Sequence, residues 1–488
     1  MRIKIGLVLL ALSGVAAAQV WEKPIAPGLV YRMEVDMKIP RIVNALRFSP
    51  GSATQGKVEL AGSAIYEETA VKGRGTVSQM VDRRGALAGI NGDYFPYTGD
   101  PLGMMVRDNE VLSIPSMPRS SIGWMNKQNS WSMGIVSWKG SFTAKGVEVP
   151  IDNINGQCGP NQIALNSAAA GFSLAKVPNV HVMIKLDSVD WSPNGTTTGT
   201  VTGMTADEPT LKVADDYVVL VATGNKTGNV TGLRSGDQVI FKMQSEGIDW
   251  TKVDQLISGG PCLLKDGQTV VDDVAQKFNS AFSKQQHPRT AIGRTANGDF
   301  YFVTVDGRQQ MSRGVTLVEL ADVMKKLGCT DAINVDGGGS TDMTIFGVVV
   351  NRPSDGIERP VANGVLFFGD KPASTSGALN IEGPASLDQG ATVTLRATDN
   401  DKVVGDAEVI WGAQGAAWID QGGLLHPWKL GKCTVSAWIR GHVVTKTIDI
   451  IVSQSKTRDT NTTSRAGSGR DSRSKTTPVK TKGKGKGG

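Results

Sequence analysis

The sequence predicts a mixed α/β chain in which a larger α+β domain with a mixed sheet precedes an all-β sandwich. A strand-helix-strand pattern is readable at residues 300–335, and short alternating segments typical of strands fill residues 379–452. Residues 371–378, which contain Pro, Gly and two Ser, separate the two patterns as a linker. We therefore expect folded units at residues 19–370 and 379–453.

The first 18 residues have the three regions of a secretory signal peptide. Arg2 and Lys4 precede an apolar run at residues 5–15, and small residues follow at 16–18. The run is too short to cross a membrane, and no later stretch is long enough to do so. We expect a mature chain that begins near Gln19 and is secreted or associated with the cell surface, without a transmembrane segment.

The strand-helix-strand unit can be assigned from local signals. Phe300 to Val305 is aromatic and β-branched, as expected of a strand buried on both faces. Thr316 and Glu319 form a capping box, so a helix should begin there. Residues 332–335 then form a second short strand. The apolar residues on one face of the helix are Leu317, Leu320, Ala321, Met324 and Leu327, and Gly328 supplies the stop.

Two carboxylates, Asp306 and Asp336, each follow one of these strands. If both strands lie in one sheet, a helical connection makes them parallel, with a right-handed crossover. Both carboxylates would then emerge at the same sheet edge, where open α/β sheets usually bind ligands.

Three consecutive glycines, Gly337, Gly338 and Gly339, follow Asp336. Such a run permits a sharp turn and directs backbone N–H groups at an anion, and the Ser340 hydroxyl could add a donor. The alternative is a plain turn into a hairpin at residues 343–350. Nearby arginines favour an anion site, because guanidinium forks suit phosphate; they are Arg289, Arg308, Arg352 and Arg359.

These motifs resemble the phosphodiester glycosidase domain family. The resemblance covers about residues 27–369, is strong after 287 and is weak from about 125 to 255. Asp93 departs from the second glycine of many members, and the middle region could carry an insertion. The motifs are Arg289-Thr-Ala-Ile-Gly293, Val305-Asp-Gly-Arg308, Ser312-Arg-Gly-Val-Thr-Leu317, Asn334-Val-Asp-Gly-Gly-Gly-Ser340, Asn351-Arg-Pro353, Arg359-Pro-Val-Ala-Asn363, Ile90-Asn-Gly-Asp-Tyr-Phe95 and Ser258-Gly-Gly-Pro-Cys-Leu263.

The resemblance implies an exported hydrolase that cleaves the glycosidic bond of a sugar 1-phosphodiester, for example an N-acetylglucosaminyl one, in a surface glycan or exopolysaccharide. Phosphate is already a weakly basic leaving group, so charge stabilisation should matter more than a general acid. Asp306 and Asp336 are then the candidates for nucleophile or base, with Glu358 in reserve. The expected substrate-binding residues are Asn91, Asp93, Arg289, Arg308, Gly337, Gly338, Gly339, Ser340, Arg359 and Asn363, with Asp93 a further reserve for catalysis.

The spacing of Asp306 and Asp336 would bear on stereochemistry. Neighbouring strands lie about 4.8 Å apart. Adjacent strands would give the carboxyl separation of a retaining glycosidase, and one intervening strand would give that of an inverting one. The sequence leaves this choice open. It also leaves open an ordinary glycoside hydrolase and a surface protein that binds phosphorylated glycan without turnover.

A short internal repeat lies outside these motifs. Pro118-Arg-Ser-Ser-Ile-Gly123 resembles Pro288-Arg-Thr-Ala-Ile-Gly293, and each is followed by a turn-like segment and another apolar run. We hypothesise two related hairpins, each presenting an arginine, Arg119 or Arg289, to a shared cleft. Chance similarity is the alternative for so short a match.

The C-terminal segments resemble bacterial immunoglobulin-like modules. Val409-Ile-Trp411, Ala417-Trp-Ile-Asp420 and Gly431-Lys-Cys-Thr-Val435 carry this resemblance. It implies an all-β immunoglobulin-like sandwich at residues 379–453, which more often spaces or attaches a catalytic domain than performs chemistry.

Charge is concentrated at the end of the chain. Residues 454–488 contain ten Lys or Arg and two Asp, whereas residues 19–453 are mildly acidic. We expect a disordered basic tail that could hold an anionic cell-surface polymer, and no specific nucleic-acid partner.

The cysteines and histidines show no metal-ligand spacing, so we expect no metal site and no cofactor; a calcium requirement cannot be read from the sequence. Disulfide pairing stays open, with Cys158 to Cys262 the preferred bridge if one forms.

Overall fold

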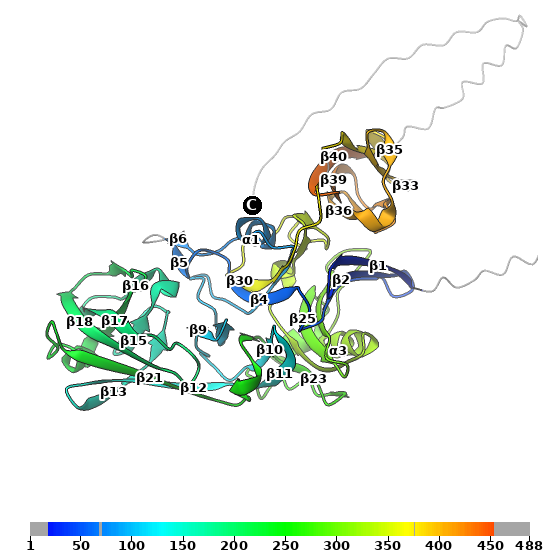
Figure 1. Cartoon of the computed structure of the whole chain (residues 1–488). Coiled ribbons are helices and arrows are strands. Elements are labelled where there is room, and N and C mark those ends of the chain that lie inside the picture. Colours follow the sequence, from blue (N-terminus) through cyan, green and yellow to red (C-terminus); the bar gives the residue numbers. More distant parts are fainter. Residues whose placement is uncertain (1–17, 68–70, 375, 453–488) are drawn as a thin grey trace, which may run out of the picture. The chain divides into compact units, whose positions relative to one another are not determined.

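The computed structural model describes residues 18–67, 71–374 and 376–452 (Figure 1). The predicted signal peptide and basic tail therefore fall outside the described residues, apart from Ala18. The described residues as far as Ile451 form one compact unit. Within them, no helix is long and apolar enough to cross a membrane. The α-helices are α1 (Val77–Arg84), α2 (Ser280–Lys284) and α3 (Leu317–Lys326), and strands dominate the rest.

An eight-stranded sheet carries the predicted strand-helix-strand unit. Every neighbouring pair in it is antiparallel, so the predicted mixed sheet is wrong for this layer. The two strands flanking α3 do run parallel, because both pair with β25, which lies between them. The order is β1 (Gln19–Ala26), β2 (Leu29–Asp36), β3 (Arg41–Phe48), β26 (Phe300–Val305), β25 (Arg289–Thr295), β27 (Cys329–Asn334), β23 (Cys262–Lys265) and β24 (Gln268–Thr269).

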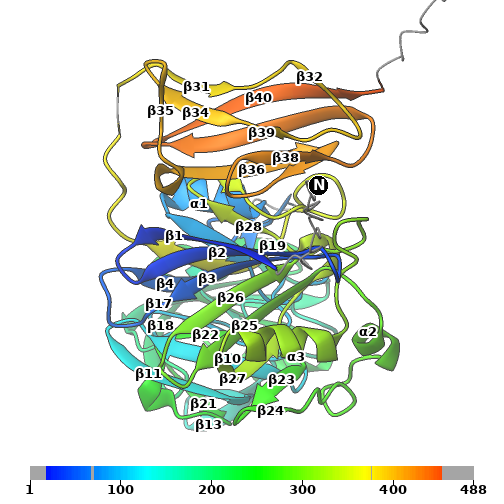
Figure 2. The same cartoon turned by 90° about the vertical axis from the view of Figure 1, so that its right-hand side faces the viewer.

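Helix α3 covers this sheet and confirms the predicted helix (Figure 2). The Thr316 hydroxyl accepts a hydrogen bond from the Glu319 N–H at 3.2 Å, and the Glu319 carboxylate accepts one from the Thr316 N–H at 2.7 Å. Leu317, Leu320 and Met324 are fully buried and pack with residues of β25, β26 and β27. The apolar face predicted from periodicity is thus the face that fixes the helix on the sheet.

Two five-stranded sheets supply the other walls of the site. One has the order β11 (Gln128–Ile135), β10 (Ser120–Met125), β22 (Gln255–Ser258), β8 (Met105–Arg107) and β9 (Glu110–Ser113). The other has the order β29 (Val348–Val349), β28 (Met343–Ile345), β7 (Ala88–Asn91), β30 (Asn363–Phe368) and β4 (Gln55–Leu60). The hairpin β28–β29 confirms the one predicted after the glycines. Helix α1 packs on β7, β28 and β30, and it too begins with a capping box, formed by Thr76 and Gln79.

The middle of the chain forms an eight-stranded sheet with a hydrophobic core of its own. One neighbouring pair in it, β14 and β15, is parallel. The order is β13 (Val147–Ile151), β12 (Ser137–Ala144), β21 (Gln238–Glu246), β18 (Thr196–Ala206), β17 (Asn179–Ser188), β20 (Tyr217–Thr223), β15 (Ile163–Asn166) and β14 (Asn153–Ile154). Two short ribbons complete the region: β16 (Phe172–Leu174) with β19 (Thr210–Lys212), and β5 (Tyr66–Glu67) with β6 (Val71–Lys72).

The C-terminal residues form three small sheets around one core. Trp411 and Cys433 are buried in that core. All four cysteines of the chain are free, so the Cys158–Cys262 bridge is not formed. The sheets are β31 (Leu379–Glu382), β34 (Arg396–Asp399) and β35 (Lys402–Val403); β32 (Ser386–Asp388), β40 (His442–Ile451), β39 (Gly431–Ile439) and β36 (Val409–Gly415); and β33 (Val393–Thr394), β38 (Leu424–Pro427) and β37 (Ala417–Ile419).

Candidate active site

Asp336 lies just beyond β27, on the glycine turn. Its N–H donates to the carbonyl of Gly92 at 3.0 Å, and its Oδ1 accepts from the Gly337 N–H at 2.9 Å. The turn continues into a short 3-10 helix, Gly338–Ser340, in which Gly338 has a φ of +63°. The residue is only partly buried. Burial raises the pKa of Asp336 to about 6, against the Ser340 hydroxyl, the Gly337 N–H and the Arg359 charge, which lower it.

Two arginines lie directly against the glycines. A Cβ added to Gly338 would lie 3.1 Å from Nη2 of Arg308, and one added to Gly339 would collide with Nη2 of Arg359. Arg359 also pairs with the exposed Asp355 carboxylate at 2.6 Å. Both guanidinium groups are accessible to solvent. The structure therefore brings Asp336, the glycine turn, Arg308 and Arg359 together, as the sequence predicted.

Asp306 occupies a different environment at the end of β26. It is 1% exposed, and its Oδ1 accepts a hydrogen bond from the Arg352 N–H at 3.1 Å. Its Oδ2 has no hydrogen-bond partner among the described residues. Burial raises the pKa of Asp306 to about 7, and the Arg352 N–H and guanidinium oppose this. With β25 intervening, the ends of β26 and β27 are roughly 10 Å apart. A substrate would not reach Asp306 without rearrangement.

Arg289, at the start of β25, is also buried, with 1% exposure. Its Nε donates to the Val315 carbonyl at 3.2 Å, and its Nη2 donates to the carbonyls of Phe282 and Gln285. Much of its donor capacity is thus committed to the backbone. Burial, together with a smaller contribution from the Arg308 charge, lowers the pKa of Arg289 to about 10.

Asn91, Asp93 and Asn363 form the buried floor behind Asp336. The Asn91 amide donates to the Asp336 carbonyl at 2.7 Å, and the Asn363 side-chain oxygen accepts from the Asp93 N–H at 2.6 Å. The Asp93 carboxylate accepts from the N–H groups of Tyr94 and Gly103 at 2.8 and 2.6 Å. Burial, with a smaller contribution from the Asp336 charge, raises the pKa of Asp93 to about 7, although the N–H groups of Gly103 and Tyr94 and the Arg119 charge oppose the rise. These contacts join the end of β7 and the start of β30 to the Asp336 turn.

Sequence reasoning missed Asp342, which lies two residues beyond Ser340. It is 1% exposed, and neither carboxylate oxygen makes a hydrogen bond of ordinary geometry with the described residues. Burial raises the pKa of Asp342 well above its ordinary value, and the neighbouring Glu358 carboxyl raises it further. Glu358, carried as a reserve, accepts from the Ser78 N–H in the first turn of α1 at 3.0 Å. No local sequence pattern indicates Asp342, because the carboxyl group beside it, that of Glu358, comes from another segment of the chain.

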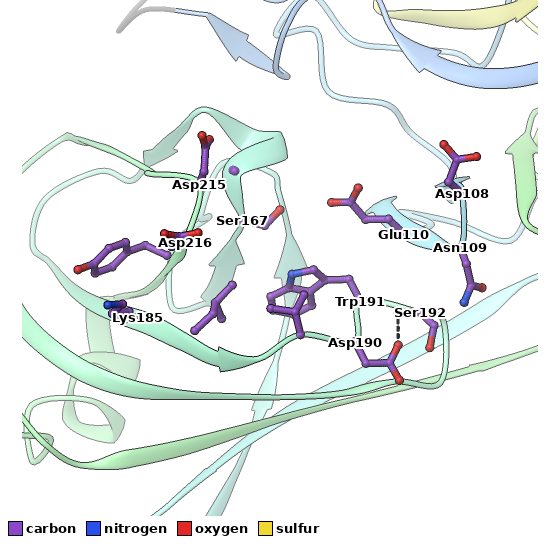
Figure 3. Close-up of a pocket in the computed structure, with 14 residues that line it drawn as sticks. Asp108, Asn109, Glu110, Ser167, Lys185, Asp190, Trp191, Ser192, Asp215 and Asp216 are labelled. Atoms are coloured by element: carbon purple, nitrogen blue, oxygen red, sulfur yellow. Dashed lines mark hydrogen bonds between the residues drawn. The ribbon is translucent and has the colours of Figure 1, made fainter. Parts of the chain in front are cut away.

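A cavity of about 620 Å³ lies elsewhere, in the middle region (Figure 3). Lys185 and Trp191 line it together with five carboxylates, those of Asp108, Glu110, Asp190, Asp215 and Asp216. Such an excess of negative charge disfavours a phosphodiester. Among the described residues, no group of His, Cys, Asp and Glu is arranged to hold a metal ion. The charge pattern therefore points to the glycine turn beside Asp336.

Part of the chain, including the glycine turn, is similar to known proteins. Residues 191–368 match the family described as phosphodiester glycosidase. The chain is 31% identical over 193 residues to the SPbeta prophage-derived uncharacterized protein YomE of Bacillus subtilis, covering 33% of this chain and 30% of that protein. It is 33% identical over 134 residues to human N-acetylglucosamine-1-phosphodiester alpha-N-acetylglucosaminidase, covering 26% of this chain and 25% of the human protein.

A hypothetical protein from Synechocystis has a similar fold, with a TM-score of 0.59 and 20% sequence identity, over 72% of this chain and 68% of that one. The chain thus spans less than a third of the length of either sequence relative. The matched segment contains β25 to β30, the Asp336 turn and the arginines around it. Residues 191–368 of this chain therefore match the phosphodiester glycosidase family.

Proposed function

We propose that this protein hydrolyses the glycosidic bond of a sugar 1-phosphodiester and that Asp336 is the reacting carboxylate. One observation carries the proposal: in a domain of the phosphodiester glycosidase family, a partly exposed carboxylate lies on a glycine turn against Arg308 and Arg359. An N-acetylglucosaminyl phosphodiester is the first substrate to test, because the human relative is named for that bond.

The chemistry needs few groups. Water adds to the anomeric carbon while the bond from that carbon to the phosphate oxygen breaks, and a free sugar and a phosphate monoester result. Asp336 either takes the proton of the attacking water or attacks first and forms a glycosyl ester that water then cleaves. Arg308 and Arg359 stabilise the charge on the departing phosphate. The Gly339 N–H is a further donor for its oxygens, whereas the N–H groups of Gly337 and Gly338 already donate to Asp336 Oδ1 and to the Pro288 carbonyl.

The buried residues have supporting roles in this proposal. Asn91, Asp93 and Asn363 hold Asp336 in place through the strand-end hydrogen bonds. Asp306 holds the Arg352 segment, and Arg289 anchors the segment before β25. Catalysis by Asp306, and substrate binding by Asn91, Asp93, Asn363 and Arg289, would require these residues to become accessible.

The test measures free N-acetylglucosamine released from its methyl 1-phosphodiester. The wild-type protein should release sugar, and D336N should lose at least about a thousandfold in rate. Asp331 lies in β27, the strand that precedes Asp336, and its carboxylate accepts hydrogen bonds from the Asp266 N–H and the Thr330 hydroxyl. D331N is therefore the matched control and should stay active. Normal turnover by D336N would refute the assignment.

The same wild-type protein and phosphodiester distinguish two other functions from the proposed one. Saturable binding of the phosphodiester with no sugar release by the wild type would identify a glycan-binding protein. Cleavage of an aryl N-acetylglucosaminide in preference to the phosphodiester would identify an ordinary glycoside hydrolase.

We further propose that the protein is exported, with its substrate in a surface glycan or exopolysaccharide. The support is the pattern of residues 1–18 and the basic composition of residues 454–488. The residues from 379 onward are proposed as an immunoglobulin-like attachment module, on the basis of their all-β composition and own core. Cell fractionation at low and high salt tests this: surface-bound protein should be released by salt. Retention in the cytoplasm would contradict export.

A further inference from the structure

Two three-stranded units beside the site have the same arrangement, in which a central strand pairs antiparallel with the next strand of the chain and with one later strand. In one, β10 pairs with β11 and β22; in the other, β25 pairs with β26 and β27. Ile122 faces Met133 and Ile257, and its counterpart Ile292 faces Phe302 and Ile333. The sequence repeat thus corresponds to a structural repeat, in which Arg119 is the counterpart of Arg289.

The two arginines meet one aromatic cluster. The Arg119 guanidinium carbon lies 3.7 Å from the ring centre of Phe278, and that of Arg289 lies 4.5 Å from the ring centre of Phe282. Phe278 and Phe282 stack on each other at 5.1 Å. Tyr94 contacts both rings, and its hydroxyl accepts from the Asn334 amide at 2.6 Å. Arg119 therefore reaches the same site as Arg289, from the opposite repeat.

The two arginines differ in what their N–H groups find. Arg289 has backbone acceptors for Nε and Nη2. Arg119 has only the Met117 sulfur, a weak acceptor, at 3.0 Å from Nη2. Its Nε and Nη1 are buried with no hydrogen-bond partner among the described residues. The Asp93 charge acts on Arg119 electrostatically, while its two oxygens accept from the N–H groups of Tyr94 and Gly103. Arg119 as a whole is half-buried, and its inaccessible N–H groups are costly to leave without an acceptor.

We infer that Arg119 binds an oxyanion of the substrate, a phosphate or a sugar carboxylate, and so takes the role that its repeat counterpart Arg289 cannot fill. The inference rests on the proposed function for the location of the substrate, but it concerns anion binding alone. It assigns the site a second positive wall, on the Tyr94 side, in addition to Arg308 and Arg359 at the glycine turn. The substrate class is then a glycan whose reacting sugar carries or adjoins such an anion.

Calorimetric titration of the full chain with inorganic phosphate, and separately with glucuronate, tests the inference. R119M keeps a side chain that can pack on Phe278 but removes the N–H groups. It should weaken binding of at least one anion about tenfold or more, the loss expected for a hydrogen bond to a charged group. R294M is the matched control, because Arg294 also lies over an aromatic ring, Trp131 at 4.7 Å, but at the far end of β25. It should bind as the wild type does.

The two anions identify the source of the oxyanion. Loss of phosphate binding alone indicates the phosphodiester itself, and loss of glucuronate binding alone indicates an acidic sugar. Should R119M fold poorly by circular dichroism, R119K, which keeps the charge but not the fork, supplies the comparison and should bind more weakly than the wild type. Unchanged binding of both anions in the folded variant, or no binding by the wild type, overturns the inference. Sugar release by the wild type is scored separately, so failure of the proposed function is recognisable on its own.

Discussion

Removing the Asp336 charge should stabilise the fold at alkaline pH while it abolishes turnover. Burial holds the pKa of Asp336 at about 6, above the ordinary value of 3.8. A raised carboxyl pKa means that the folded state disfavours the charged form. The cost is absent below the unfolded-state pKa, grows as pH rises towards the folded-state pKa, and is fully present above it. At 1.36 kcal/mol per pKa unit, the upper bound is about 3 kcal/mol.

Urea unfolding of the wild type and D336N near pH 8 and near pH 4 measures this cost. The carboxamide keeps an acceptor for the Gly337 N–H, so the substitution chiefly removes charge. D336N should be more stable by about 1 to 3 kcal/mol near pH 8, and the difference should largely disappear near pH 4. D331N controls for removal of a carboxylate elsewhere in β27. Equal stability of D336N and wild type at both pH values, or a less stable D336N near pH 8, would refute the argument.

Three further outcomes are expected. The acidic limb of kcat/KM for the phosphodiester should fall at a pH of about 6, because Asp336 must be ionised to act; full activity well below that value would assign the reaction to another group. G339A should displace the exposed Arg359 side chain and raise KM about tenfold, with little change in stability. G390A is the control and should have no effect, because a Cβ added there meets nothing within 4 Å. An unchanged KM in G339A would show that Arg359 does not bind the phosphate. N363A should lower the free energy of unfolding in urea by about 1 to 3 kcal/mol, because it leaves the buried Asp93 N–H unpaired. N380A, at an exposed position, should lower it little. Equal losses would contradict the supporting role proposed for Asn363.

Local signals predicted α3 well. The capping box at Thr316 and the apolar spacing that follows act within one turn or one face of a helix, and α3 begins and packs as they indicate. The strand order depended on a non-local fact, the insertion of β25 between β26 and β27. No residue within β26 or β27 specifies its neighbour, so the sequence left that choice open and the expected mixed sheet proved wrong here.

The site was predictable in part for the same reason. Asp306 and Asp336 look alike in sequence, since each follows a buried strand. What separates them is the Arg352 segment, which covers Asp306, and the glycine turn, which leaves Asp336 partly open. Arg119 keeps N–H groups without acceptors, and Asp342 lies beside Glu358, because segments distant in the sequence pack together at both places.

A crystal structure of D336N bound to the N-acetylglucosamine methyl phosphodiester tests directly whether Asp336 is the reacting carboxylate. We expect the anomeric carbon to face the side chain at position 336 and the phosphate oxygens to lie within hydrogen-bond distance of Arg308 or Arg359. A sugar whose anomeric carbon faces another carboxylate, or a phosphate held away from the glycine turn, would contradict this expectation.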